Sequence, residues 1–208
     1  MQSISDKTIN RLTLYHCILI DLIKKGESNV TSSLMAELLG VDDSQVRKDI
    51  SVLNLGKGKS RVGYDAVELR SAIEKTLGFQ SPKNAFIIGA GNLGLALAKY
   101  DNFSNYGLNV LALFDNDPKI IGKKVNDKEV YNISKLPALT QKLDTEMAIL
   151  TVPSQFAQST TDLLMAAKIK YIWNFTARIL RVPKGVEVWN QNLMGNFLQF
   201  GYKINNKL

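Results

Sequence analysis

The chain has little of the residues that most often build metal sites, disulfides and hydrolase centres. Its 208 residues include one cysteine, Cys17, and one histidine, His16. A single cysteine cannot form an internal disulfide, and one Cys with one His cannot close a zinc site, so we expect no metal. A Ser-His-Asp or Cys-His enzyme would have to depend on His16 alone.

Long hydrophobic runs are also missing. Every apolar run falls well short of the about 18 residues that identify a transmembrane helix. The N-terminal sequence MQSISDKTINRL lacks the basic segment followed by an apolar segment that marks a signal peptide. We therefore expect a cytoplasmic protein.

The chain carries an excess of positive charge, most of it in its second part. Lys and Arg number 26 against 19 Asp and Glu, which gives a formal net charge of +7. Residues 1–78 hold eleven of the cations and ten of the acids, so total charge is a weak argument for a nucleic-acid partner. Residues 44–61, by contrast, carry five cations and one acid.

The segment Gly78–Pro82 separates two parts of different pattern. Before it, apolar residues recur at helical spacing and predict helices over 6–25, 32–39, 44–53 and 66–77. After it, apolar strands alternate with helical stretches, as in a parallel, doubly wound sheet. We predict an α/β protein with a helical domain at 1–80, a sheet domain at 81–190 and a terminal helix at 191–208.

The helix predicted over 44–53 has two different faces. Its apolar residues Val46, Ile50 and Leu53 lie on one side. Two helices joined by a short glycine-containing turn, the second with a basic face, are typical of a helix-turn-helix DNA-binding unit. The competing interpretation is the solvated surface of an ordinary helical bundle. The basic face presents two cations and two hydroxyls and no carboxylate, from Ser44, Arg47, Lys48 and Ser51.

The next segment, residues 55–64, holds three cations, three glycines and no acid. It is too glycine-rich for a helix and suits a flexible hairpin, or wing, whose backbone can approach phosphates that Lys and Arg neutralise. A basic hairpin after a basic helix favours a winged-helix DNA-binding domain over a mobile surface loop. The predicted DNA contacts are Ser44, Gln45, Arg47, Lys48, Ser51, Lys57, Lys59, Ser60, Arg61 and Tyr64.

The second part opens with a phosphate-binding pattern. An apolar strand over 84–88 leads into a G-x-G-x-x-G motif at 89–94 and a helix predicted over 95–100. Gly89 allows a tight turn, Gly91 lets the backbone approach a pyrophosphate, and Gly94 permits close packing of helix on strand. The competing interpretation is that these glycines serve packing alone.

An acid follows the next strand at the spacing that a dinucleotide-binding domain requires. Asp115 ends the apolar run 109–114 and lies 21 residues after Gly94. A carboxylate there can bind both ribose hydroxyls and repels a 2′-phosphate, so it favours NAD over NADP. The competing interpretation makes Asp115 a turn residue.

Further alternation extends the sheet and defines its ligand edge. Strands are predicted over 146–152, 171–173 and 187–189, with a helix over 155–167. Ligands of such sheets bind at the carboxyl ends of the strands, which gathers Asp115, Thr151 and Asn174 around one crevice. The apolar terminal stretch 193–202 predicts a helix that packs on its own sheet or into a partner subunit.

In combination, these features resemble the Rex family of redox-sensing transcriptional repressors, and the resemblance covers essentially the whole chain. The motifs that carry it are Arg11-Leu12-x-Leu14-Tyr15, Gln45-Val46-Arg47-Lys48-Asp49-Ile50-Ser51, Gly63-Tyr64, Gly89-Ala90-Gly91-Asn92-Leu93-Gly94, Phe114-Asp115-Asn116-Asp117-Pro118, Ile149-Leu150-Thr151-Val152-Pro153 and Asn174-Phe175.

The resemblance implies a homodimer with domain-swapped C-terminal helices, which binds a palindromic operator when NADH is scarce and leaves it when NADH binds. The glycine loop would hold the pyrophosphate of NAD(H), and Asp115 the adenine ribose. Tyr100 matches a tyrosine that helps to couple nucleotide state to the angle between domains. The implied NAD(H) site comprises Gly89, Ala90, Gly91, Asn92, Leu93, Gly94, Asp115, Asn116, Thr151, Val152, Pro153, Asn174 and Phe175.

The chain departs from the family pattern at clustered positions. Cys17 and Asn192 stand where members often carry an Arg and an Asp that pair across the dimer, and Leu193 replaces an aromatic residue. Losing both partners avoids an unpaired buried charge but removes an electrostatic latch. Asn54 stands where the family usually has Gly, and the wing is one residue longer. These departures predict that nucleotide binding is retained, while the discrimination between NADH and NAD⁺ or the operator preference is altered.

Two other functions compete with a redox-sensing repressor. An NAD-dependent dehydrogenase needs an acid or base beside the nicotinamide, and the one histidine lies far from the crevice in sequence. No catalytic residue is therefore expected, and a sensor needs none. A nucleotide-binding module without DNA affinity is the other alternative, and the basic helix and wing argue against it.

Overall fold

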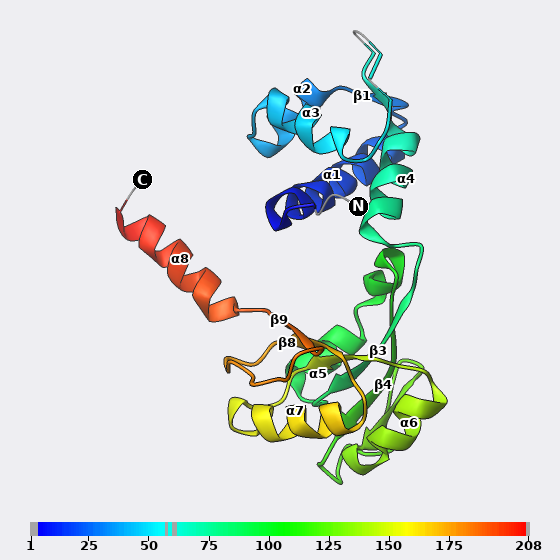
Figure 1. Ribbon diagram of the computed structural model, residues 1–208, viewed down its shortest axis with the longest axis vertical. Coiled ribbons are helices and arrows are strands. Elements are labelled where there is room, and N and C mark those ends of the chain that lie inside the picture. The colour runs from blue at the N-terminus through cyan, green and yellow to red at the C-terminus, as the bar shows by residue number, and fades with distance from the viewer. Residues whose placement is uncertain (1–3, 57, 60–61, 207–208) are drawn as a thin grey trace. The chain divides into compact units, whose positions relative to one another are not determined.

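The computed structural model describes residues 4–56, 58–59 and 62–206, and the chain divides into two compact units between Ser81 and Pro82 (Figure 1). The elements of the first unit are α1 (Asp6–Lys24), β1 (Asn29–Val30), α2 (Ser32–Leu39), α3 (Asp43–Ser51), β2 (Tyr64–Asp65) and α4 (Ala66–Leu77).

Side-chain caps start the helices of the first unit, and left-handed glycines follow two of them. The Thr31 hydroxyl accepts from the backbone N–H of Leu34 at the start of α2, and Asp42 caps α3 in the same way. Such caps satisfy backbone donors that have no partner inside the helix. Gly40 ends α2 and Gly78 ends α4, each with a positive φ that costs glycine little.

A buried carboxylate ties α3 to α1. Asp49 is 2% exposed, and its oxygens accept from Arg11 Nε at 2.6 Å, Arg11 Nη2 at 2.8 Å and the Tyr15 hydroxyl at 2.8 Å. Gln45 Nε2 adds a fourth bond at 2.9 Å. Burial by itself raises the pKa of Asp49, but these hydrogen bonds outweigh it and hold the pKa below its ordinary value. The carboxylate is therefore ionised at neutral pH.

A glycine holds the base of the wing against β1. β1 and β2 pair antiparallel, and Lys59 exchanges backbone hydrogen bonds with Gly63. Gly63 has a φ of +88°, and a Cβ on it would lie 2.2 Å from the carbonyl oxygen of Val30. No other residue fits there, which explains the Gly63-Tyr64 pair in physical terms. Lys57, Ser60 and Arg61, three of the predicted wing contacts, lie outside the described residues.

The second unit is built on a seven-stranded sheet with the order β5-β6-β4-β3-β7-β8-β9. All neighbouring pairs are parallel except β5 with β6. The parallel strands follow the 3-2-1-4-5-6 order of dinucleotide-binding domains. The strands are β3 (Lys83–Ile88), β4 (Leu108–Asp115), β5 (Lys124–Val125), β6 (Lys128–Asn132), β7 (Met147–Leu150), β8 (Tyr171–Asn174) and β9 (Glu187–Asn190).

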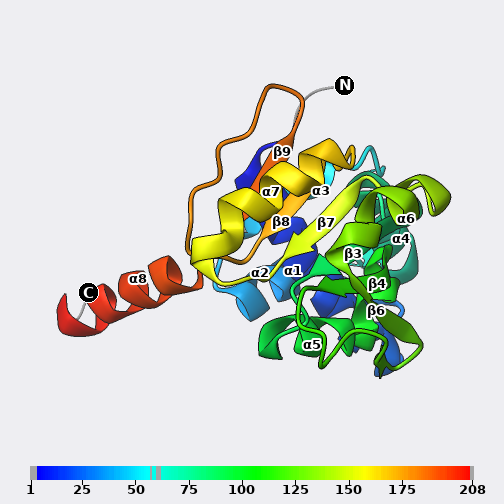
Figure 2. The same ribbon diagram turned by 90° about the horizontal axis from the view of Figure 1, so that it is seen from below.

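Helices cover both faces of this sheet. Phe86 and Ile88 of β3 belong to the core cluster under α6 and α7, whereas Ala85 and Ile87 belong to the cluster under α5. Both views show α5 on one side of the sheet and α6 and α7 on the other (Figures 1 and 2). The helices are α5 (Asn92–Ala98), α6 (Leu136–Lys142) and α7 (Ala157–Ala166), with short 3₁₀ turns at Asp101–Tyr106, Ile133–Lys135 and Ser154–Phe156.

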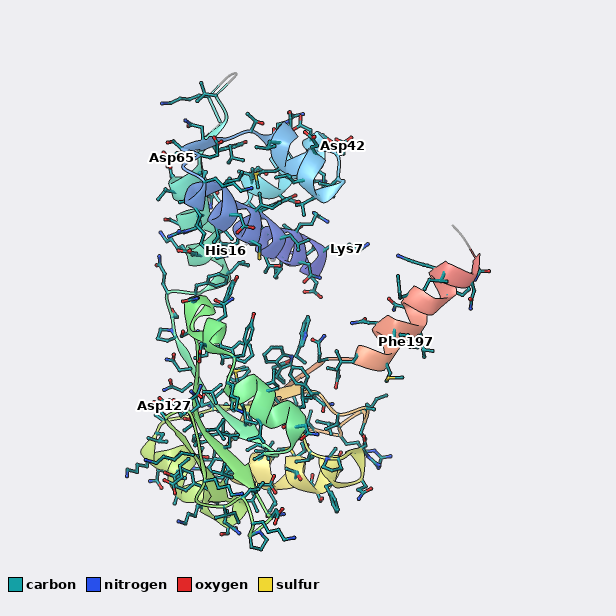
Figure 3. All side chains as sticks on the ribbon, turned by 180° about the vertical axis from the view of Figure 1, so that it is seen from behind. Lys7, His16, Asp42, Asp65, Asp127 and Phe197 are labelled. Atoms are coloured by element: carbon teal, nitrogen blue, oxygen red, sulfur yellow. The ribbon has the colours of Figure 1, made fainter. Side chains whose placement is uncertain are left out.

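The last helix, α8 (Leu193–Asn206), buries none of its described residues. Figure 3, in which Phe197 is labelled, shows the side chains along it. Seven apolar side chains are each more than half exposed: Leu193, Met194, Phe197, Leu198, Phe200, Tyr202 and Ile204. Despite this apolar surface, no helix in the described part of the chain has the length and hydropathy to cross a membrane.

Several element boundaries differ from those predicted. Helix α3 ends at Ser51 rather than at residue 53, because its last turn tightens toward Asn54, which has a φ of +54°. Helix α5 begins at Asn92, inside the glycine motif, rather than at residue 95. Strand β7 ends at Leu150, so residues 151–153 form the loop beyond the strand instead of its last residues.

Replacing Asp49 with Asn should lower the free energy of unfolding by roughly 3 kcal/mol, because Arg11 then loses its buried partner. Since the folded pKa of Asp49 lies below 3.8, its contribution is present above about pH 4 and is lost as the pH falls through the folded pKa. Urea unfolding across acid and neutral pH should therefore show a shallower acid decline in Asp49→Asn. Asp21→Asn, which alters an exposed carboxylate of α1, is the control. Equal acid sensitivity of Asp49→Asn and the parent would contradict this account.

Candidate DNA interface and nucleotide site

The basic face of α3 is exposed as predicted. Ser44, Lys48 and Ser51 are all exposed, and the opposite residues Val46 and Ile50 are buried. The Arg47 guanidinium pairs with Asp43 one turn earlier on the same helix. Exposed pairs at this spacing contribute little, so the pair leaves Arg47 available to a stronger anion.

Two other predicted contacts lie beside that face. Gln45 is half-buried at the flank of α3, where its amide donates to Asp49. Tyr64 is half-buried on β2 and lines a groove of about 560 Å³ together with Lys59. The groove also contains Ser32 and Ser33 from the first turn of α2, which were not predicted from the sequence. Hydroxyls beside a helix-turn-helix are the signal that could have found them.

The glycine motif has a different steric reason at each position. Gly89 has a φ of +102°, so the turn after β3 favours glycine. A Cβ on Gly94 would lie 1.9 Å from the carbonyl oxygen of Gly89, so α5 can pack this closely on the loop only without a side chain. A Cβ on Gly91 would meet no atom within 4 Å. The motif therefore combines two packing glycines with one that borders open space.

Thr151, the first residue after the neighbouring strand β7, holds this loop in place. Its hydroxyl donates to the Gly89 carbonyl oxygen at 2.8 Å, with the Ile88 carbonyl oxygen 3.1 Å away. Because β3 and β7 are adjacent, the loop after β7 lies directly against the loop after β3. The predicted crevice residue thus fixes the shape of the glycine turn with its hydroxyl.

Asp115 lies at the carboxyl end of β4 and faces the same loop. One carboxylate oxygen accepts from the Ala90 N–H at 2.7 Å, and the other accepts from Asn116 at 2.7 Å and Asp117 at 2.9 Å. A carboxylate offers about four lone-pair positions, so further acceptor capacity remains for a hydroxyl. The arrangement fixes a negative charge beside the glycine loop.

These residues border one pocket of about 910 Å³. Ile120, Ile133, Phe156, Thr160, Thr176 and Ala177 also line it and were not selected from the sequence. The two isoleucines come from the loop after Asp115 and from the 3₁₀ turn that follows β6, a short charged strand that gave no clear pattern. The predicted residues that line it are Gly89, Ala90, Gly91, Asn92, Leu93, Asp115, Asn116, Thr151, Val152, Pro153 and Phe175.

Asn174 is buried and does not line the pocket. Its amide nitrogen donates to the Arg178 carbonyl oxygen at 2.9 Å and to Asn190 Oδ1 at 2.7 Å. Its oxygen accepts from the N–H of Thr176 at 3.0 Å and from its hydroxyl at 2.7 Å. The side chain therefore shapes the loop that carries Phe175 and Thr176 to the pocket.

Tyr100 lies outside the pocket, and a series of aromatic rings links it to the pocket wall. Its ring contacts Phe103 edge-on with centroids 4.9 Å apart, and Phe103 lies 6.1 Å from Trp173. Trp173 is 4.8 Å from Phe175, which lines the pocket. A displacement at Phe175 thus has a packed route to Tyr100.

Comparison with known proteins identifies the family. The chain is 37% identical to a redox-sensing transcriptional repressor Rex from Treponema denticola, over 96% of this chain and 95% of the relative. It is 38% identical to the repressor of the same name from Clostridium botulinum, over 98% and 97% of the two chains. The chain belongs to the Rex family. As a member of this family it is a transcription regulator rather than a dehydrogenase.

Family models and solved structures agree with this assignment. A model described as "CoA binding domain" matches residues 80–178, and one described as "Putative DNA-binding protein N-terminus" matches residues 3–51. The Rex-family repressor RSP, solved with β-NAD⁺ and operator DNA, superposes with a TM-score of 0.90 at 35% identity, covering 100% of this chain and 95% of RSP. RSP with β-NADH gives 0.87 over 100% and 97%.

Two departures from the Rex pattern preserve the backbone. Asn54 has a φ of +54°, and Asn is the side chain that adopts this left-handed conformation most readily in place of Gly. Asn192 caps α8, because its Oδ1 accepts from the Gly195 N–H at 2.8 Å. An Asp would cap equally well, so Asn192 keeps the cap and loses the charge. Cys17 is exposed on α1 and likewise carries no fixed charge.

Gly94→Ala should lower the free energy of unfolding by roughly 3 kcal/mol, because the new methyl group collides with backbone. Gly91→Ala should change the free energy of unfolding by less than about 0.5 kcal/mol, since its methyl group enters open space. Urea denaturation of the ligand-free protein measures both values, and each variant serves as control for the other. Equal losses in the two variants would contradict the steric assignment.

Proposed function

We propose that this protein is a homodimeric Rex-type repressor that binds a palindromic operator through α3 and the wing and is released when NADH occupies the pocket of the second unit. The observation that carries the proposal is the presence in one chain of a basic, exposed α3 beside a groove and of a pocket bordered by Gly91 and Asp115. A DNA-binding element and a dinucleotide pocket are the two parts that a redox-sensing repressor needs.

The pocket residues fit NAD(H). Open space over Gly91 admits a pyrophosphate close to the backbone, and Asp115 offers acceptor oxygens to ribose hydroxyls. Asp115 and Asp117 place negative charge where the 2′-phosphate of NADP would lie, which favours NAD(H). Phe175 supplies an apolar surface at the end assigned to the nicotinamide. The proposed NAD(H) residues are those predicted from the sequence, with Thr151 and Asn174 shaping the loops and Tyr100 acting beyond the pocket.

The proposed DNA contacts are the ten residues predicted over 44–64. Ser44, Arg47, Lys48 and Ser51 would enter the major groove, where helix side chains reach base edges and phosphates. Lys59 and Tyr64 line the groove on the protein surface beside α3. Domains at 1–80, 81–190 and 191–208 would divide DNA binding, nucleotide binding and dimerisation. A repressor of this kind works on the chromosome, so we assign it to the cytoplasm.

The dimer would form through α8. Its apolar residues, Phe197 among them, are exposed within the chain, and a helix with such a surface is stable only when another surface covers it. A second copy offers one, because the strands β8 and β9 form an apolar groove of about 350 Å³ lined by Tyr171, Trp173 and Trp189. Two-fold symmetry of the dimer would match a palindromic operator.

A weakened NADH response is a second candidate, favoured by Cys17 and Asn192. Neither residue carries a fixed charge, so the ion pair that members of the family often form across the dimer is missing. Without it, the difference in stability between the operator-bound and nucleotide-released states loses an electrostatic contribution. Tyr100 would then couple the pocket to DNA binding through packing alone.

NADH should weaken operator binding more than NAD⁺ does, and the double variant Cys17→Arg/Asn192→Asp should widen that difference roughly tenfold. Each single variant is a control, because one new charge without its partner cannot restore the pair. Fluorescence anisotropy of labelled operator, titrated with each nucleotide, measures the effect. Release of the parent protein by micromolar NADH, with little effect of NAD⁺ and no gain in the double variant, would exclude the weakened response.

Salt dependence tests the DNA interface. If the dimer makes about eight phosphate contacts, log K against log[salt] should have a slope near −7. Lys48→Ala removes one contact from each protomer and should make the slope shallower by about 2, whereas Lys142→Ala, an exposed residue in the last turn of α6 in the second unit, should leave it unchanged. A slope near zero for the parent protein would remove DNA as a partner.

A further inference from the structure

Gln45 occupies a distinctive position on α3. It is the third residue of the helix, in the turn from which a recognition helix usually reaches base edges. It lies at the flank between the exposed face and the buried Asp49, is half-buried itself, and donates an amide hydrogen to Asp49 Oδ1 at 2.9 Å. One edge of its amide is therefore engaged inside the protein, and the other edge has no hydrogen-bond partner among the residues that the structure describes.

The chemistry of Asp49 determines which edge that is. An ionised carboxylate only accepts hydrogen bonds, so Gln45 must turn its nitrogen toward it. Oδ1 receives Arg11 Nη2 and Gln45 Nε2, and Oδ2 receives Arg11 Nε and the Tyr15 hydroxyl. These four bonds fill the carboxylate's capacity of about four. A flipped amide would set oxygen against oxygen and leave a buried acceptor with one bond fewer.

We propose that Asp49 is a positioning residue for sequence recognition, holding the Gln45 amide so that its Oε1 and second hydrogen face the major groove and read an adenine. The inference rests on the DNA binding proposed above. An amide that keeps its oxygen and one hydrogen for a base matches adenine, which donates from N6 and accepts at N7. Guanine offers two acceptors at the same edge and cannot satisfy the oxygen.

Arg11 and Tyr15 act through Asp49. They come from α1, and their bonds hold the carboxylate in one orientation while neutralising its charge next to the DNA-facing surface. The Tyr15 hydroxyl bonds the oxygen that Gln45 does not use. Removing that hydroxyl therefore weakens the network without changing the acceptor that orients Gln45, which provides a matched control.

The test selects binding sites from duplexes with a randomised core, using the full-length protein in the presence of NAD⁺. The parent protein, Gln45→Met, Asp49→Asn and Tyr15→Phe are compared. At one position of the enriched motif, the parent protein should prefer an A·T pair roughly tenfold over the other base pairs. This preference should disappear in Gln45→Met. Asp49→Asn should lose the same preference, because an Asn amide can either donate to Gln45 or accept from it. Tyr15→Phe should keep the motif.

Several outcomes would overturn the inference. An unchanged motif in Gln45→Met would do so, as would a Gln45-dependent pair that is G·C. A loss of affinity in Asp49→Asn that is equal for all sequences would assign Asp49 a structural role alone. If the parent enriches no motif at all, the proposed DNA binding itself fails, which is distinct from enrichment that ignores Gln45.

A measurement on the parent protein covers the case in which Asp49→Asn does not fold. In the enriched duplex, the Gln45-dependent adenine is replaced with 2-aminopurine, which lacks the N6 donor, or with 7-deazaadenine, which lacks the N7 acceptor. Both replacements should weaken binding to the parent and leave binding to Gln45→Met unchanged. Tolerance of 2-aminopurine by the parent would show that Oε1 does not face the base and would overturn the proposed orientation.

Discussion

Close contacts between backbone segments that admit no Cβ hold both candidate sites together. In the first unit, a Cβ on Gly63 would lie 2.2 Å from the Val30 carbonyl oxygen, so the wing can approach β1 this closely only with glycine at this position. In the second, a Cβ on Gly94 of α5 would lie 1.9 Å from the Gly89 carbonyl oxygen. Gly63 pairs with Lys59 and precedes Tyr64, which line the candidate DNA groove, and Gly94 packs on the loop whose Ala90 N–H donates to Asp115. The binding surfaces are thus fixed by steric constraints rather than by the binding residues themselves.

Hydrogen-bond networks around two buried side chains also support the candidate sites. Asp49 joins α3 to α1 through four hydrogen bonds, and Asn174 orders the loop after β8 through four more. Both side chains are buried, and a buried polar group is stable only when its bonding capacity is met. Each network therefore allows few alternative arrangements of the surface it supports. Each network thus supports a candidate site from beneath its surface.

Much of this architecture could be predicted from the sequence, because its signals are local. Caps, left-handed glycines and alternating strands gave the helices of the first unit and the parallel sheet. The features that could not be predicted depend on contacts between residues far apart in the sequence. Asp49 reads as one more surface acid on a charged helix, and only the fold brings it to Arg11, 38 residues earlier. Ile133 escaped notice because the strand before it is short and charged.

The asymmetry of α3 has a consequence for how such a regulator changes over evolutionary time. One side of the helix is anchored by Asp49, Val46 and Ile50, which are buried, while Ser44, Lys48 and Ser51 are exposed on the other side. Substitutions at the exposed positions therefore leave the core of the first unit intact, and substitutions at the buried positions do not. A single helix thus combines a mutable face with a structural one, so its surface can change one residue at a time without loss of the fold.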